Sequence, residues 1–139
     1  MLDLLPISGF KWMEELPKQE DILNYDLESS KGCFLEVDAH IPEHLHNELN
    51  DLPIFPEKID IHESMISERS RVLRESKLGD VGTFCSEKLA PNLLEKRSYK
   101  CHIAALKLYC ELGGVVTKVH RGVSFNQSRW LAPYIEVIL

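Results

Sequence analysis

Two hydrophobic periods follow each other directly in the last third of the chain, and they restrict its fold more than any other feature. Ile103, Leu106 and Cys110 are three and four residues apart, the spacing that places side chains on one face of a helix. A glycine pair at 113–114 follows, and glycine readily adopts the left-handed conformation in which many helices end. The sequence therefore predicts an amphipathic helix over 99–112 that ends in a tight turn.

The segment after this turn alternates as a strand does. Apolar or β-branched side chains recur at every second position, with Arg121 as an interruption, and we expect them on one side: Val115, Thr117, Val119, Val123 and Phe125. Lys118, His120 and Ser124 are expected on the other side. Helix, turn and strand would make one packing unit, whose apolar side the rest of the chain must cover.

A second strand is predicted at 33–41. Its apolar residues alternate with mostly polar ones, as in an antiparallel sheet with one exposed side: Cys33, Leu35, Val37, Ala39 and Ile41. Shorter patterns predict a helix at 18–25, one or two helical turns at 44–52 and a short strand at 58–62. Residues 1–12 are interpreted as an irregular turn. We expect an α+β fold with a mostly antiparallel sheet and one packed helix.

The chain has 139 residues, of which 44% are apolar and 27% charged, as in an ordinary globular domain. We expect a single domain over 1–139, with a helical or irregular insertion at 64–88. No stretch has the length of a membrane helix, so we expect no membrane partner. No secretion signal precedes the four dispersed cysteines, which favours a reducing intracellular location, in the nucleus or the cytoplasm.

Paired carboxylates are the first candidate chemistry. Glu36 and Asp38 are two residues apart and therefore project to the same face of the predicted strand. Such a pair can hold a divalent cation or act as acid and base, but no third ligand has a defined spacing to it, so we favour a solvated polar face. Histidines at 40, 44 and 46 lack the paired cysteines typical of structural zinc. We name no catalytic and no metal-binding residue.

Basic residues near the C-terminus are the candidate binding site. The net charge is −6, but acidic residues concentrate before residue 70 while 88–129 is basic, and binding depends on where charge lies. Lys118 and His120 share a predicted strand face, and Arg121 points the opposite way unless a bulge turns it. The candidate DNA-binding residues are Lys118, His120, Arg121, Arg129 and Lys107. Contact with phosphates and ordinary surface charge are here two equally weighted interpretations.

Eight short stretches occur along the chain in a fixed order: LPISGFKW at 5–12, GCFLEVD at 32–38, LHN at 45–47, LPIFPEKI at 52–59, LAPNL at 89–93, LKLYCELG at 106–113, KVHRGVSF at 118–125 and QSRWLAPYI at 127–135. This order resembles the palm region of organellar and viral type-B DNA polymerases. These are protein-primed replicases, which large self-synthesising DNA transposons also carry. The resemblance spans nearly the whole chain and implies a DNA-proximal part of the polymerase palm.

The resemblance also implies what the chain lacks. In the family, the first metal-binding aspartate stands in a Ser/Asn-Leu-Tyr context that Asp3 does not have, and the fingers motif and the Asp-Thr-Asp segment are absent. Because such polymerases hold two metal ions with these aspartates, this chain alone is expected not to polymerise DNA. No cofactor is expected in this chain, and two Mg²⁺ ions only in a complete polymerase.

The expected partners follow from the same resemblance. They are DNA, the missing polymerase segments, or a second copy of the chain, because an incomplete sheet leaves an open edge. The alternative is a non-catalytic nucleic-acid-binding or protein-interaction module derived from a mobile element.

Overall fold

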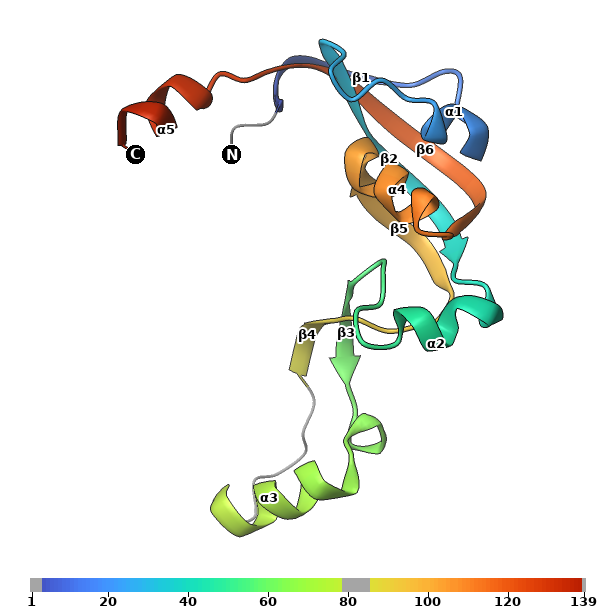
Figure 1. Cartoon of the computed structure of the whole chain (residues 1–139), viewed down its shortest axis with the longest axis vertical. Helices are drawn as coiled ribbons and strands as arrows, with labels where there is room; N and C mark the ends of the chain where they lie inside the picture. Colours follow the sequence, from blue (N-terminus) through green and yellow to red (C-terminus); the bar gives the residue numbers. More distant parts are fainter. Residues whose placement is uncertain (1–3, 79–85, 139) are drawn as a thin grey trace. The chain divides into compact units, whose positions relative to one another are not determined.

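The computed structural model describes residues 4–78 and 86–138 (Figure 1). The chain divides into two compact units. We call Met1–Ile54 together with Leu93–Leu139 the sheet unit, and Phe55–Asn92 the hairpin unit. The predicted insertion at 64–88 falls inside the hairpin unit, and part of it, 79–85, lies outside the described residues. The expectation of one domain over the whole chain stays a prediction.

The sheet unit is built on four antiparallel strands in the order β1-β6-β2-β5. The strands are β1 Leu5–Trp12, β2 Lys31–His40, β5 Lys96–His102 and β6 Val115–Ser128. β2 and β6 lie in the middle, and β1 and β5 form the two edges. The predicted strands at 33–41 and after the glycine pair are confirmed, and so is the α+β class with a mostly antiparallel sheet.

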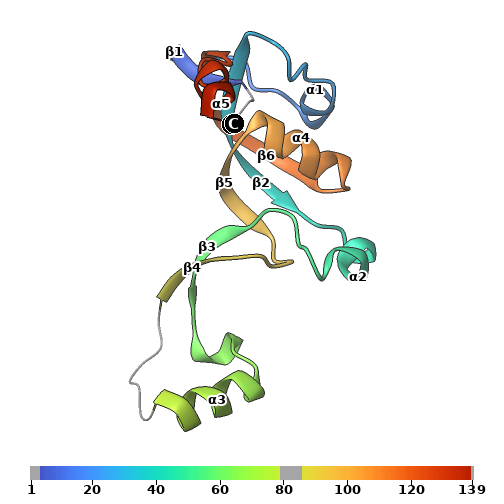
Figure 2. The same ribbon diagram turned by 60° about the vertical axis from the view of Figure 1, so that its left-hand side comes forward.

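Helices cover one face of this sheet, as Figures 1 and 2 show for α4. They are α1 Gln19–Leu23 and α4 Ile103–Glu111, which contact each other, and α4 also contacts β2 and β5. The core between helices and sheet consists of fully or almost fully buried side chains: Ile22, Cys33, Leu35, Val37, Ala39, Ile103, Leu106 and Cys110. Their alternation on β2 and their three-and-four spacing on α4 are the two periods that the sequence displays.

α4 ends in the glycine turn that the sequence predicts. Gly113 has a φ of 97°, a conformation that a side chain would strain, and its backbone N–H bonds to the carbonyl of Cys110. Gly114 donates to the carbonyl of Tyr109. These bonds satisfy carbonyls of the last helical turn and direct the chain straight into β6.

Two irregularities in the β2–β6 pairing change which side chains share a face. The register shifts between Glu36 and Val37, and again between Asp38 and Ala39. Each shift leaves one extra residue on β6, and such a bulge reverses the alternation beyond it. Val119 lies opposite Val37, whereas Val123 lies opposite Phe34. The prediction that Val119 and Val123 share one side of the strand is therefore wrong.

The two edge strands were not predicted. Residues 5–12, interpreted as an irregular turn, form β1. The pairing of β1 with β6 shifts register twice, and Gly9 within β1 has a φ of 71°. Residues 99–102, interpreted as the start of the helix, form the end of β5 instead. The helix begins only at Ile103, because His102 accepts a hydrogen bond from the backbone N–H of Ala104 and caps it.

Short elements complete the sheet unit: a 3-10 turn at Glu43–Leu45, α2 His46–Leu49 and α5 Ala132–Ile138. α1 and α2 confirm the helical turns predicted at 18–25 and 44–52. No residue of α5 is buried, although several of its side chains are large and apolar. No helix of the described residues is long and apolar enough to cross a membrane.

The hairpin unit pairs β3 Glu57–Ile61 antiparallel with β4 Ser86–Ala90. A 3-10 turn at Glu63–Met65 and α3 Glu68–Leu78 follow β3. α3 carries ion pairs from Arg71 to Glu68 and from Arg74 to Glu63. It corresponds to the helical alternative predicted for the insertion at 64–88.

Candidate binding face of the four-stranded sheet

Among the described residues of the sheet unit, no helix covers the sheet face opposite α4, and we call this the open face. In an antiparallel sheet, residues directly opposite each other project to the same side. The register therefore places one set of side chains there from all four strands: Trp12, Phe34, Glu36, Asp38, Lys100, His102, Lys118, Arg121, Val123 and Phe125. Half of the open face is aromatic or apolar and half is charged.

Aromatic rings occupy the end of the open face nearest the start of β2. Phe125 is 1% exposed, and the ring centroids of Phe10, Phe34 and His102 lie 5.6, 5.3 and 5.8 Å from its own. Phe34 also meets His102 edge-on at 5.3 Å. Phe34 itself remains 44% exposed and Phe10 59%. Phe125 thus anchors a ring cluster whose outer members face solvent.

A hollow of about 430 Å³ lies beside this cluster. Its lining is mostly apolar, with three charged side chains among the residues around it: Trp12, Phe34, Leu35, Glu36, Lys100, Arg121, Gly122 and Val123. Trp12 is 65% exposed, and the guanidinium carbon of Arg121 lies 5.6 Å from the centre of its ring. Arg121 and Trp12 are thus held together by a cation–π contact at one wall of the hollow.

Arg121 is paired with an acid across the strands. Its Nε donates to Oε2 of Glu36, the residue directly opposite on β2. This hydrogen bond is the main reason why the pKa of the Glu36 carboxyl lies below its usual value, with Lys100 contributing by its charge. A bulge next to Arg121 turns its side chain to the face that carries Lys118. Glu36 therefore offsets the charge of Arg121.

Asp38 gathers a second group of partners. The backbone N–H of Ser98 donates to its Oδ1 at 2.8 Å, and Nε2 of His120 lies 2.8 Å from its Oδ2. This second contact is an ion pair only when the imidazole is protonated. The bond from Ser98, then His120 and Lys118, lowers the pKa of Asp38.

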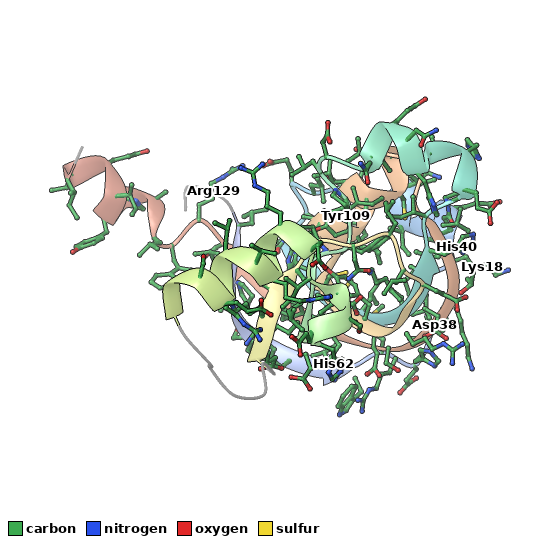
Figure 3. The ribbon with its side chains drawn as sticks, turned by 90° about the horizontal axis from the view of Figure 1, so that it is seen from below. Lys18, Asp38, His40, His62, Tyr109 and Arg129 are labelled. Carbon is green, nitrogen blue, oxygen red and sulfur yellow. The ribbon has the colours of Figure 1, made fainter. Side chains whose placement is uncertain are left out.

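The structure brings only three of the five predicted DNA-binding residues together. Lys118, His120 and Arg121 lie around Glu36 and Asp38. Arg129 pairs with Glu28, and Figure 3 shows it well apart from Asp38. Lys107 extends from α4, on the covered side of the sheet, and donates to the carbonyl of Tyr25 at 2.9 Å.

Three exposed residues of the open face are not among the predicted DNA-binding residues. Trp12, Phe34 and Lys100 lie on three different strands and meet only because of the register. Of these three residues, only Phe34 could have been found from the sequence, because it is an aromatic residue on the otherwise polar side of an alternating strand. Trp12 and Lys100 were missed because 5–12 were interpreted as a turn and 99–102 as the start of a helix.

The described thiols lie away from the open face. Within 4–78 and 86–138, no group of three or more His, Cys, Asp or Glu side chains is arranged to hold a metal ion. His46 contacts the carbonyl of Ile41 at 2.9 Å. Cys33, Cys101 and Cys110 are free thiols on the covered side of the sheet, and burial raises their pKa values to about 11, 12 and 11.

Comparison of the chain with known protein families, with curated proteins and with solved structures finds no match. The resemblance to type-B polymerases therefore rests on the eight sequence stretches alone.

Proposed function

We propose that the sheet unit is a non-catalytic, DNA-binding part of a type-B polymerase palm, and that it contacts DNA through the open face. The observation that carries this proposal is the placement of exposed Trp12 and Phe34 next to Lys100 and Arg121 on the open face. Aromatic faces stack on bases, and cations next to them bind the phosphates. The order of sequence stretches supplies the palm and the replication context.

Electrostatics of the open face argue for weak binding. Glu36 pairs with Arg121, so this cation does not act as a free charge toward phosphate. Lys100 and Lys118 are exposed and are the cations best placed to meet a backbone. For single-stranded DNA, each phosphate contact contributes about −0.7 to the slope of log affinity against log salt, so two contacts give about −1.4. A protein that coats the backbone would show a much steeper slope.

Fluorescence anisotropy of a labelled single-stranded oligonucleotide tests the proposal. We expect binding at low salt with a shallow salt slope. The double variant Lys100→Gln/Lys118→Gln should reduce both affinity and slope, whereas Lys31→Gln, also exposed on the sheet unit but away from the hollow, should change neither. Glu36→Gln should raise affinity, because it removes a negative charge beside Arg121. Absence of binding at low salt contradicts the proposal.

Catalysis is tested separately by primer extension with the purified chain, template, nucleotides and Mg²⁺. We expect no incorporation, because the family's aspartate motifs are missing from the sequence. Metal-dependent extension would overturn the non-catalytic part of the proposal and leave the DNA-binding part intact.

A protein-interaction module is the second candidate, and the sheet edges favour it. β1 and β5 each have one hydrogen-bonded neighbour among the described strands, so their outer backbone groups can pair with another chain. The α5 region adds exposed Trp130, Tyr134 and Val137, the last 86% exposed. Light scattering across a concentration series tests this candidate. A concentration-dependent dimer without DNA affinity would favour it over DNA binding.

A further inference from the structure

We propose that the hollow beside Trp12 holds one unpaired nucleobase, so that the ligand of the open face is single-stranded nucleic acid and not duplex. This inference rests on the proposed DNA-binding function and specifies its ligand. Four observations carry it: the size of the hollow, its lining, the exposure of its rings and the position of its charges.

The size and lining suit one flat ring system. A volume of about 430 Å³ is at the small end of the roughly 300–1,000 Å³ found for small-molecule sites. Phe34 and Val123, directly opposite each other on β2 and β6, supply apolar surface, and Trp12 stands opposite Val123 on β1. A nucleobase has the flat, polarisable faces that such a lining covers best.

The rings that line the hollow are partly exposed, unlike the buried ring of Phe125 next to them. Phe125 is 1% exposed, whereas Trp12 is 65% and Phe34 44% exposed. Trp12, on the edge strand β1, and Phe34, on the central strand β2, therefore both keep ring surface open to a ligand. Arg121 lies 5.6 Å from the Trp12 ring centre, and a guanidinium plane is itself a stacking surface for a base.

The positively charged side chains lie beside the proposed base site, where the phosphate attached to a bound base would lie. Lys100 on β5 and Arg121 on β6 both line the hollow, on either side of Glu36. One carboxylate against two cations leaves a single net positive charge at the hollow, enough for one phosphate and too little for a duplex backbone.

Single-strandedness follows from stacking geometry. In a duplex both faces of each base are occupied by neighbouring pairs, so only edges and phosphates are accessible. Trp12 and Phe34 can stack only on a base whose face is exposed. A protein partner is less well matched, because extended peptides bind sheet edges through backbone groups, and the hollow lies on the face.

The fluorescence of Trp12 gives a direct test. The chain contains two tryptophans, so Trp130→Phe leaves Trp12 as the sole indole. In this background, titration with unlabelled oligo(dT) should quench Trp12 emission saturably, and a duplex of equal length should not. Trp12→Ala should weaken oligo(dT) binding about fivefold or more in anisotropy, since stacking contributes about 1–3 kcal/mol per base. Trp12→Phe should restore most of the affinity.

The outcomes separate this inference from the proposed function. If DNA binds with the expected salt slope but Trp12 emission is unchanged and Trp12→Ala binds normally, the hollow is not the base site and the DNA-binding proposal survives. Equal quenching by duplex also overturns the inference. If no DNA binds, both fail. If Trp12→Ala abolishes self-association and leaves DNA affinity unchanged, the hollow belongs to a protein interface and the inference is wrong. Urea midpoints of the variants check that loss of affinity is not loss of folding.

Discussion

Ser98 donates its backbone N–H to Oδ1 of Asp38 at 2.8 Å from a left-handed backbone with a φ of 50°. A residue other than glycine rarely adopts this conformation, and such positions persist where a specific contact holds them. The register of β2 against β5 shifts at this point, between Val37 and Ala39. Asp38 therefore both fixes a bulge in the edge strand β5 and contacts Nε2 of His120.

Asp38→Asn should lower stability near neutral pH and have little effect in acid. The pKa of Asp38 is lowered in the folded protein, so its contribution is present above the ordinary carboxyl pKa of 3.8 and is lost as pH falls through the folded value. Urea midpoints measured near pH 7 and in acid should converge for the two proteins. Asp51→Asn, at an exposed carboxylate outside the sheet strands, is the control and should match the unsubstituted protein at both pH values.

Protonation of His102 should lower the free energy of unfolding below about pH 6.5. Burial lowers its pKa, and neutral Nδ1 accepts from the N–H of Ala104 at the start of α4. A lowered histidine pKa means that the unfolded chain takes up the proton first, so stability is lost as pH falls from the ordinary value towards the folded one. His102→Asn keeps a capping acceptor without titrating and should flatten this part of the pH profile. His102→Ala should cost about 1 kcal/mol near pH 7. An unchanged profile in His102→Asn would contradict this role.

Leu106→Ala should destabilise the sheet unit by about 2–5 kcal/mol, because Leu106 is fully buried under α4 and its loss leaves a cavity. Leu108, two residues along the same helix, is 51% exposed. Leu108→Ala provides a matched control that removes the same atoms, and its effect should stay within about 0.5 kcal/mol. Chemical denaturation of both variants measures the difference. Equal effects would mean that α4 does not pack as described.

The buried thiols should react slowly in the folded protein. Burial raises the pKa of Cys33 from 9.0 to about 11, which reduces its reactive thiolate about a hundredfold at neutral pH. In a Cys85→Ser background, which removes the cysteine outside the described residues, an aromatic disulfide reagent should label the remaining thiols rapidly only after unfolding. Rapid labelling of the folded chain would contradict the burial of these thiols.

The same thiols predict an alkaline loss of stability. Their folded pKa values are raised, so their contribution is present below the ordinary value of 9.0 and is lost as pH rises through about 11. Urea midpoints across this range should fall for the unsubstituted protein and fall less for Cys110→Ala.

The sequence by itself determined the central elements of the fold. The period of two at 33–41 and the three-and-four spacing of Ile103, Leu106 and Cys110 each identify the face of an element that must be buried. The left-handed glycine at 113 fixes where α4 ends and β6 begins. These features are local, because each depends on the order of neighbouring residues along the chain and on the side on which they project.

Only the tertiary structure decided the composition of the open face. A bulge adds one residue to β6 and reverses its alternation, so Arg121 joins Glu36 and Val123 joins Phe34. The edge strands β1 and β5, whose sequences lack a clean period, add Trp12 and Lys100 through pairing alone. The physical reason is that a strand's register is set by the partner with which it exchanges hydrogen bonds, and one residue of shift moves every following side chain to the opposite face.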